Sequence, residues 1–472
     1  MTKIKAHTLL ACGLFAVFRG FGMGKCDEKM NNACTLCRFG VIYEILENIE
    51  LGKIGFMKEE KQKVQTKPEN LSKTTVGKCN GPVLALLFGS LRAYYFLRGV
   101  RIKRKVLCGG QPASPAIVLC NHGSFIDFIY AGSLLYKSKP HFIVARLYFY
   151  HRILGWMLRK VGAFPKSMFA LDMESAKNCL RVLNNGEILA MMPEARLSTA
   201  GRFEDIQPST YSFLKKSKVP IYTVKLRGDY FANPKWGNGV RRGAKIEAEL
   251  DILYTAEQVQ EMTLEQLKEG VEQRLYYDEF QWLASRPDVH YHSKKLAEGL
   301  ENILTVCPCC HEKYTVTTKG HTLTCKNCGE LTSLDDRYGF SGDFCFENFG
   351  QWYQWQFDRM RQEILENPTY CLSSKVELRL PGDGKHLTRS AGQGVCTLSR
   401  DGLCYEGTRD GEQVRIHFGR QQIYRLLFGA GENFEIYNGN EILYFVPECK
   451  QSSVDWYMAS IILGDEATEQ TG

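Results

Sequence analysis

Short apolar runs alternate with amphipathic stretches through the central part of the chain. Four runs are brief, apolar and rich in branched side chains, as buried strands are, at residues 115–120, 141–145, 186–193 and 219–226. Between these runs, residues 147–161 and 170–183 carry apolar side chains at helical spacing. A charged stretch with a helical pattern follows at residues 255–273. This alternation predicts an α/β layered domain.

The pattern changes beyond Tyr338. An aromatic helix is predicted at residues 349–365, and several strand candidates follow, separated in places by Gly, Asn and Asp turn signals. The strand candidates are residues 375–380, 394–399, 402–407, 413–418, 423–428, 433–438 and 441–447. A helix at 453–463 comes last. Strands in this number with one C-terminal helix are the layout of a pleckstrin-homology-like (PH-like) barrel, so we expect a mostly β C-terminal domain of that kind.

No stretch reaches the roughly 20 apolar residues needed to cross a bilayer. The best candidate, residues 83–97, contains Arg92 and is followed by a basic cluster of Arg98, Arg101, Lys103, Arg104 and Lys105. A helix of this kind suits the membrane interface, with cations at anionic headgroups. It suits equally well a core helix followed by a solvated basic turn.

Length and composition indicate a modular globular protein. The chain has 472 residues, 44% hydrophobic and 24% charged, and roughly 100 to 200 residues per domain predicts two to four domains. The formal net charge of +8 suits an anionic membrane surface, an acidic ligand or nucleic acid without choosing among them. The 18 cysteines do not form a secreted disulfide pattern, so a reducing cytoplasm is expected.

The sequence predicts no defined role for the N-terminal segment, residues 1–75. An apolar run at residues 8–18 after two lysines superficially resembles a short signal peptide, but the run is very short and we expect no secretion. Cys34 and Cys37 form a single CxxC, which is more typical of ordinary buried cysteines than of a metal site.

The chemistry is predicted at residues 121–127 (NHGSFID), directly after the first buried strand. A carboxylate five residues after a histidine, at the start of a helix, can hold one imidazole nitrogen while the other takes a proton from a hydroxyl. His122 is therefore the candidate general base, and Asp127 the residue that orients it and stabilises the imidazolium. Alone, such a pair is usually structural.

Four sequence blocks in a fixed order strengthen the prediction that His122 and Asp127 are catalytic. The segment resembles the NH-x-x-x-x-D signature of the 1-acylglycerol-3-phosphate acyltransferase superfamily of glycerolipid acyltransferases, over about residues 87–253. Further blocks of that family are matched by residues 162–165 (GAFP), 192–198 (MPEARLS) and 219–221 (VPI). The resemblance implies transfer of a fatty acyl group from a thioester, acyl-CoA or acyl carrier protein, to the hydroxyl of a lysophospholipid.

The substrate-binding residues are predicted from these blocks, with two departures from the family pattern. The family's second block usually ends in an arginine that reads the substrate phosphate, and Lys166 is the candidate substitute here. In the third block Ala195 replaces glycine, and Arg196 sits one place early. This form is similar to bacterial 2-acylglycerophosphoethanolamine acyltransferase domains, which keeps lysophosphatidylethanolamine open as acceptor beside 1-acylglycerol 3-phosphate.

Residue chemistry completes the predicted site. Arg196 could pair with the glycerol phosphate in a forked geometry, and Glu194 could fix the glycerol or Arg196. Ser124 is a further candidate contact of the substrate. Backbone amides near Val219 and Pro220 are the candidate oxyanion donors.

A second group of residues, four cysteines, predicts a bound metal ion. Two CxxC knuckles separated by fourteen residues match a zinc ribbon with four thiolate ligands, Cys307, Cys310, Cys325 and Cys328. Four ligands close such a site, so the zinc is expected to be structural. Cys309 and His311 lie in or beside the first knuckle and leave the ligand set open.

The expected organisation is an N-terminal segment (1–75), an acyltransferase domain with an interfacial helix (76–290), a zinc ribbon (300–335), and an aromatic helix with a PH-like β domain (340–472). We expect a peripheral protein on the cytoplasmic face of a membrane, with no nucleic-acid partner. The alternative from another class is an inactive acyltransferase-like scaffold that binds through its zinc ribbon; the presence of both His122 and Asp127 argues against it.

Overall fold

The structure, a computed structural model, describes residues 75–469 except 238, 383–385 and 424. The hypotheses about the apolar run and the CxxC before residue 75 lie outside the described residues. Within the described part, no helix is long and apolar enough to cross a membrane.

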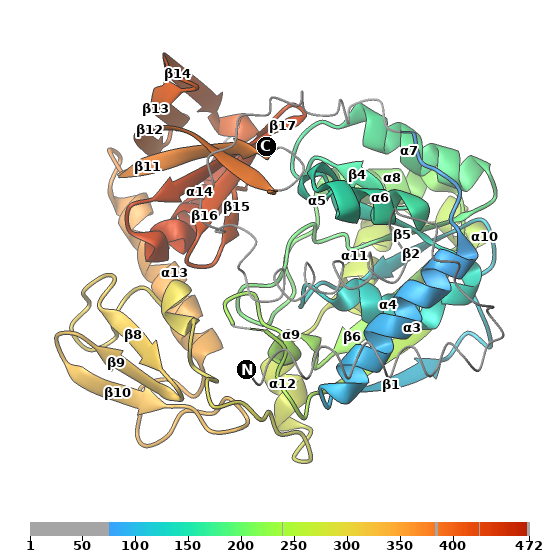
Figure 1. Ribbon diagram of the computed structural model, residues 1–472, viewed down its shortest axis with the longest axis horizontal. Coiled ribbons are helices and arrows are strands. Elements are labelled where there is room, and N and C mark those ends of the chain that lie inside the picture. The colour runs from blue at the N-terminus through green and yellow to red at the C-terminus, as the bar shows by residue number, and fades with distance from the viewer. Residues whose placement is uncertain (1–74, 238, 383–385, 424, 470–472) are drawn as a thin grey trace, which may run out of the picture. The chain divides into compact units, whose positions relative to one another are not determined.

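A seven-stranded sheet in the order β1-β7-β6-β2-β5-β3-β4 forms the first domain (Figure 1). Its strands are β1 (Arg101–Val106), β2 (Ala116–Cys120), β3 (His141–Ala145), β4 (Phe164–Lys166), β5 (Ile188–Met191), β6 (Ile221–Arg227) and β7 (Lys245–Tyr254). Neighbouring strands pair in parallel except β6 and β7. All four strands predicted in this region are present. Of the two interpretations of residues 83–105, the basic turn holds only at Arg98 and Gly99, because the residues from Arg101 to Val106 form the edge strand β1.

Helices cover this sheet and complete its core. They are α3 (Gly81–Leu97), α4 (Asp127–Leu135), α5 (Leu147–Tyr150), α6 (Arg152–Lys160), α7 (Met173–Asn184), α8 (Pro208–Ser217), α9 (Asp229–Ala232), α10 (Ala256–Glu261), α11 (Leu264–Leu275) and α12 (Glu279–Ala284). Val182 of α7, Leu214 of α8 and Leu267 of α11 join the strand residues in one buried cluster. The single helix predicted at 147–161 is divided, because His151 is extended and its side chain caps α6 at Leu154 N.

The ends of β2 and β6 lie together at one edge of the seven-stranded sheet, directly before His122 and Asp229. β2 and β6 run in parallel and both end there, at Cys120 and Arg227. β7 runs antiparallel to β6 and parallel to β1, so Arg101 and Lys245 begin their strands at the same edge. We call it the carboxyl edge.

A three-stranded antiparallel sheet follows, formed by β8 (Val316–Lys319), β9 (Thr322–Cys325) and β10 (Gly329–Ser333). Cys325 ends β9, and Cys328 directly precedes β10. The helix α13 (Phe349–Glu366) holds the segment before this sheet, because Trp352 Nε1 donates to the Val306 carbonyl at 2.9 Å.

The C-terminal domain is a seven-stranded antiparallel sheet in the order β14-β13-β12-β11-β17-β16-β15. Its strands are β11 (Cys371–Pro381), β12 (Thr388–Ser399), β13 (Gly402–Arg409), β14 (Glu412–Gly419), β15 (Leu427–Gly429), β16 (Asn433–Asn438) and β17 (Glu441–Pro447), followed by α14 (Ser453–Glu469). The expectation of a mostly β domain with a final helix is confirmed. The predicted strand at 423–428 is wrong in extent, since pairing begins only at Leu427.

α14 is buried on all sides from Ser453 to Leu463. Three consecutive residues face three different neighbours. Asp455 accepts from Thr305 Oγ1 and Tyr314 OH of the three-stranded domain, and Trp456 stacks on Phe434 of the C-terminal sheet with ring centroids 4.2 Å apart. Tyr457 contacts the first domain. The helix therefore joins the three domains of the described chain.

Candidate active site

His122 and Asp127 meet where β2 ends and α4 begins. His122 Nδ1 lies 3.0 Å from Asp127 Oδ2, with the imidazole 23% exposed and the carboxylate fully buried. Because Asp127 accepts at Nδ1, the lone pair of Nε2 faces outward, and Nε2 forms no hydrogen bond within the described residues. The predicted geometry of a base and its orienting carboxylate is thus present.

Hydrogen bonds to the main chain hold this turn. Asn121 accepts from Leu226 N at 2.7 Å and donates to the Leu226 carbonyl at 3.1 Å, which clamps the end of β2 to β6. The backbone N–H of Ser124 donates to Asp127 Oδ2 at 2.8 Å. Ser124 is fully buried, so its position serves the turn, and its proposed contact with substrate has no support in the geometry.

Glu194 acts on the same turn from the third block. Its carboxylate accepts from His122 N at 2.8 Å, from Glu204 N at 2.9 Å and from Tyr277 OH at 3.2 Å. Burial raises its pKa to about 8. The structure places Glu194 beneath the backbone of His122, so it fixes the position of the base.

The electrostatics favour a neutral histidine. Burial and the positive charge of Lys235 lower the pKa of His122 to about 4. Burial raises the pKa of Asp127 and also that of Asp229, where the negative charge of Asp127 adds to it. Asp229 lies under Gly123, since a Cβ on that glycine would be 2.4 Å from Asp229 Oδ2. The Ser124 N–H, which donates to Asp127 Oδ2, acts in the opposite direction to burial and lowers the pKa of Asp127.

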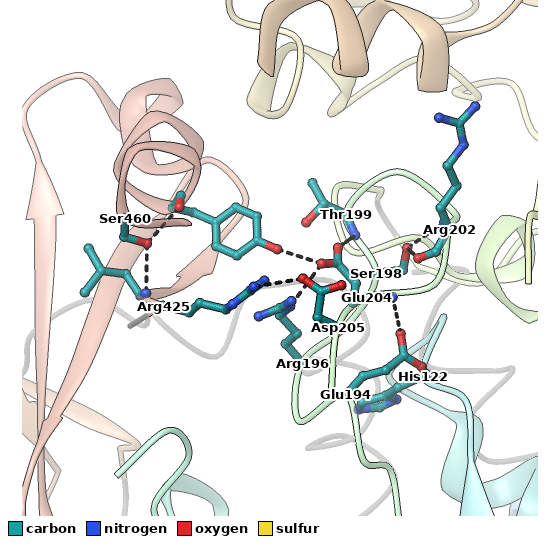
Figure 2. Close-up of polar contacts among 12 residues, drawn as sticks. His122, Glu194, Arg196, Ser198, Thr199, Arg202, Glu204, Asp205, Arg425 and Ser460 are labelled. Atoms are coloured by element: carbon teal, nitrogen blue, oxygen red, sulfur yellow. Dashed lines mark hydrogen bonds and ion pairs between the residues drawn. The ribbon is translucent and has the colours of Figure 1, made fainter. Parts of the chain in front are cut away.

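Arg196 lies beside this turn in contact with α14 (Figure 2). Its Nε donates to Glu204 Oε2 at 3.0 Å, and the same oxygen accepts from Tyr457 OH at 2.9 Å. Next to it, Arg425 Nη2 lies 2.8 Å from Asp205 Oδ2. The side chain of Arg196 is only 2% exposed.

Lys166 ends β4, paired with Ala145 at the end of β3, so it lies at the carboxyl edge as the second block requires. Beside it is Arg146, which the sequence did not single out. Arg146 is buried and donates to Asp172 Oδ2 at 2.8 Å and to Ser167 Oγ at 2.9 Å. This ion pair orders the loop that follows Lys166.

The expectation for the oxyanion donors is wrong. Val219 and Pro220 precede β6, and the Pro220 carbonyl accepts from Ile117 N at 3.0 Å, at the beginning of β2. His122 follows the other end of that strand. At about 3.3 Å per residue, the length of β2 separates the two sites, so these amides cannot reach the reacting carbonyl.

The four predicted metal ligands converge. The Sγ atoms of Cys307, Cys310, Cys325 and Cys328 all lie within 4.8 Å of one another. The Sγ atoms of Cys307 and Cys328 are 4.0 Å apart, and those of Cys310 and Cys325 are 3.7 Å apart. A tetrahedral zinc with Zn–S bonds of about 2.3 Å separates its sulfurs by about 3.8 Å. The cluster can therefore hold zinc, and Cys309 and His311 lie outside it.

A strand-terminal histidine held by a buried carboxylate, with its second nitrogen open, has the geometry needed to activate a hydroxyl for group transfer. The Acyltransferase family model matches residues 101–227, which contain this site. This match supports the resemblance to the 1-acylglycerol-3-phosphate acyltransferase superfamily that the motifs predict.

The relatives match only part of this chain. The chain is 27% identical over 129 residues to the chloroplastic 1-acyl-sn-glycerol-3-phosphate acyltransferase of Arabidopsis thaliana, covering 27% of this chain and 36% of that protein. It is 24% identical over 143 residues to the 1-acyl-sn-glycerol-3-phosphate acyltransferase of Bacillus subtilis, covering 29% of this chain and 68% of that protein. A solved structure, the 1-acyl-sn-glycerophosphate acyltransferase PlsC of Thermotoga maritima, aligns at 16% identity over 58% of this chain and 96% of its own, with a TM-score of 0.32.

Besides Arg146, the sequence did not single out Asp229, Lys235 or Tyr457. Asp229 follows β6 at the carboxyl edge, a position where polar residues often serve a site, and that placement was the available signal. No sequence signal pointed to Lys235 or Tyr457. Tyr457 reaches Glu204 across 253 residues of sequence.

Proposed function

We propose that this protein transfers a fatty acyl group from a thioester donor to the free hydroxyl of a lysophospholipid, with 1-acylglycerol 3-phosphate as the acceptor and phosphatidate as the product. The observation that carries the proposal is the open Nε2 of His122, held by Asp127 at 3.0 Å on the other ring nitrogen. The relatives named as acyltransferases of this acceptor support the substrate class.

The chemistry needs only the histidine pair. His122 Nε2 takes the proton of the acceptor hydroxyl as its oxygen attacks the thioester carbonyl, and Asp127 stabilises the imidazolium that forms. The C–S bond of the tetrahedral intermediate then breaks, and the leaving thiolate takes the proton from the His122 imidazolium. The donor is acyl-CoA or acyl carrier protein, and either supplies the same thioester.

Substitution of the base tests this mechanism. We expect His122→Ala to lower acyl transfer by about 10²- to 10⁴-fold, and Asp127→Asn to lower it severely, in a folded protein. The assay mixes the protein with acyl-CoA or acyl carrier protein and a panel of lysolipids, and measures the products by lipid analysis. His417→Ala, at an exposed position of β14, is the control. Near wild-type turnover in His122→Ala would refute the mechanism.

Two alternatives are separated by the same assay. Acylation of lysophosphatidylethanolamine is favoured by the third-block form at residues 193–196, and would appear as phosphatidylethanolamine. A scaffold without activity, binding through the cysteine cluster, would give no product with any acceptor. The buried carboxylates that hold His122 favour an active enzyme.

The cysteine cluster and the C-terminal domain have supporting roles in this proposal. The four thiolates bind a structural zinc that closes the ribbon. The C-terminal domain, with its antiparallel strands and final helix, is PH-like and serves as a contact module.

The proposed enzyme works from the cytoplasmic face of a membrane as a peripheral protein, since the acyl tail of a lysolipid stays in the bilayer. The support lies at the end of α3, where Phe96 is 60% and Leu97 is 68% exposed. The chain then enters β1 at Arg101, at the carboxyl edge that also carries His122. Exposed apolar side chains next to cations suit an anionic lipid surface.

A further inference from the structure

A groove of about 330 Å³ lies between α3, β1 and β7, at the end of α3 that leads into β1 (Figure 1). Val100, Ile102 and Ile246 give it an apolar floor, and Phe96 forms one wall. Phe96 is 60% exposed and the neighbouring Leu97 is 68% exposed, so the apolar surface continues from the groove to the outer end of α3. A ligand of this groove therefore meets apolar surface as well as charge.

Three cations that line the groove have no carboxylate partner among the described residues. Arg92 of α3 and Lys103 of β1 are exposed and form no ion pair there. Arg101 Cζ lies 4.2 Å from the centroid of the Phe96 ring, and Arg101 Nη1 donates to the Phe96 carbonyl at 3.2 Å. These two contacts hold the guanidinium at the wall of the groove, with its other N–H groups left for a ligand.

The carboxylates next to the groove are already paired. Glu247 lies in the lining and pairs with Arg286, and Asp288 pairs with Arg286 at 2.9 Å and with Lys245 at 3.0 Å. Residues 75–126, which contain α3 and β1, include no aspartate or glutamate. The chain therefore leaves the positive charge of the other three cations unbalanced, and the groove attracts an anion.

The groove is separate from the catalytic site. β6 lies between β7 and β2, the strand that ends before His122. Even β7, the nearer of the two strands at the groove, is thus two strand spacings, about 10 Å, from β2. The phosphate and the free hydroxyl of 1-acylglycerol 3-phosphate are carried by adjacent carbon atoms. A phosphate in the groove therefore belongs to a second molecule, and not to an acceptor whose hydroxyl is at His122.

We propose that this groove binds the phosphate of an anionic phospholipid through Arg92, Arg101 and Lys103, and that this lipid, distinct from the substrate, docks the carboxyl edge to the membrane. The glycerol and acyl carbons of the lipid lie against Phe96 and Leu97. This inference rests on the proposed function, in which the acceptor lies in a membrane, and deepens it by naming the lipid class at the docking surface.

The chemistry of the groove selects among phosphate ligands. Guanidinium and ammonium groups both match phosphate oxygens. The apolar floor favours a lipid over free phosphate, because an inorganic ion gains nothing from apolar surface. An anionic headgroup is favoured over phosphatidylcholine, because the three cations repel a quaternary ammonium group.

Binding of a water-soluble, short-chain lipid to the full chain tests the groove. In titration calorimetry, dihexanoylphosphatidylglycerol should bind saturably, and dihexanoylphosphatidylcholine and inorganic phosphate should bind more weakly. We expect Arg92→Gln to weaken binding of phosphatidylglycerol about tenfold or more, as loss of a charge-assisted hydrogen bond predicts, and Arg92→Lys to restore part of it. Arg104→Gln is the matched control, because it removes the same charge at an exposed position of β1 that does not line the groove.

Two results would overturn the lipid site. Equal weakening by Arg92→Gln and Arg104→Gln would mean that the lipid is attracted only by the overall charge of this surface. Equal affinity for inorganic phosphate and phosphatidylglycerol would mean that the apolar floor contributes nothing and that the groove is a free-phosphate site.

An activity measurement separates this inference from the proposed function. With the acceptor in phosphatidylcholine vesicles, added phosphatidylglycerol should lower the apparent KM of the wild type, and should lower that of Arg92→Gln less. If the wild type acylates lysophosphatidate but Arg92→Gln binds phosphatidylglycerol unchanged, the groove is refuted and the enzyme stands. If no acceptor is acylated but binding of phosphatidylglycerol depends on Arg92, the lipid site stands and the proposed function fails.

Discussion

At the residue scale, the contacts of His122 hold its imidazole in one orientation, and burial favours its neutral form. Its Nδ1 is bound by Asp127, its N–H by Glu194, and its carbonyl by Ser198 N. Each of these contacts acts on the position or tautomer of the imidazole, and none occupies Nε2. The proposed base is thus fixed by the protein on every side except at Nε2.

The pH profile should report the lowered pKa of His122. The neutral imidazole is the active form, so activity is present above its pKa and lost as pH falls through it. Because burial and Lys235 lower that pKa to about 4, we expect kcat/KM to stay nearly constant from neutral pH down past about 6.5, the ordinary histidine value. Removing the charge in Lys235→Gln should move the acid limb upward. An acid limb at the ordinary histidine value in the wild type would contradict this account.

Gly123 permits the close approach of Asp229 to the catalytic turn. A Cβ there would lie 2.4 Å from Asp229 Oδ2 and 3.3 Å from Tyr230 Cβ. We expect Gly123→Ala to displace the turn and lower kcat by about tenfold or more while the protein remains folded, since a misplacement near 1 Å can cost about 10²-fold. In Gly89→Ala, on α3, nothing lies within 4 Å of the new Cβ. Equal kcat in the two variants would show that the turn tolerates the shift.

At the element scale, the two cysteine knuckles show how short motifs bind metal. Cys325 and Cys328 stand at the end of β9 and the start of β10, and the loop from Cys307 to Cys310 is closed by His311 N donating to the Cys307 carbonyl at 3.0 Å. A small sheet of three short strands has little core of its own, so the metal would supply much of its stability.

Zinc content and local stability test this. We expect about one zinc per chain by elemental analysis of protein purified without chelator, and loss of that zinc in Cys325→Ser. Hydrogen exchange should then increase in residues 300–335, with no direct effect on the chemistry at His122. Cys309→Ser, whose thiol is exposed and outside the cluster, should keep its zinc. Zinc-free wild-type protein would remove the hypothesis.

At the scale of the whole molecule, the basic cluster has a defined orientation. In the strand β1, alternate side chains face opposite sides of the sheet. Arg104 turns to α4, where it donates to the Ser133 carbonyl at 3.2 Å, and Lys105 lies 3.6 Å from Glu249. Arg101 and Lys103 are exposed and form no ion pair with the described carboxylates. Together with Arg104 and with Arg98, which is half-buried, they are the cations of the cluster that have no carboxylate partner in the described chain.

Neutralising this pair tests the membrane proposal. Each cation near an anionic surface contributes about 1 kcal/mol, so Arg101→Gln with Lys103→Gln should weaken binding to anionic vesicles about tenfold or more at low salt. Apparent KM for vesicle-borne lysolipid should rise, and activity on detergent-dispersed substrate should change little. Lys216→Gln with Lys218→Gln, two exposed positions before β6 at the opposite edge, is the control. Equal vesicle binding by both double variants would place the attachment elsewhere.

The sequence by itself determined the features that depend on neighbours in the chain. The strand that ends before His122, the carboxylate five residues on, the paired CxxC knuckles and the β-rich C-terminal region all follow from local spacing, because buried strands, helix starts and metal loops are set by residues close together. The edge strand β1 was missed for the same reason, since its polar side chains lack the apolar pattern of a buried strand.

Only the tertiary structure decided which distant residues meet. The register of β2 against β6 places Val219 and Pro220 at the opposite end of β2 from His122, although both belong to the fourth sequence block that resembles the family. The burial of α14 brought Tyr457 to Glu204 across 253 residues and to Arg196, and the loop after α9 brought Lys235 to the same ring. These contacts depend on packing between segments far apart in the chain, which no local spacing encodes.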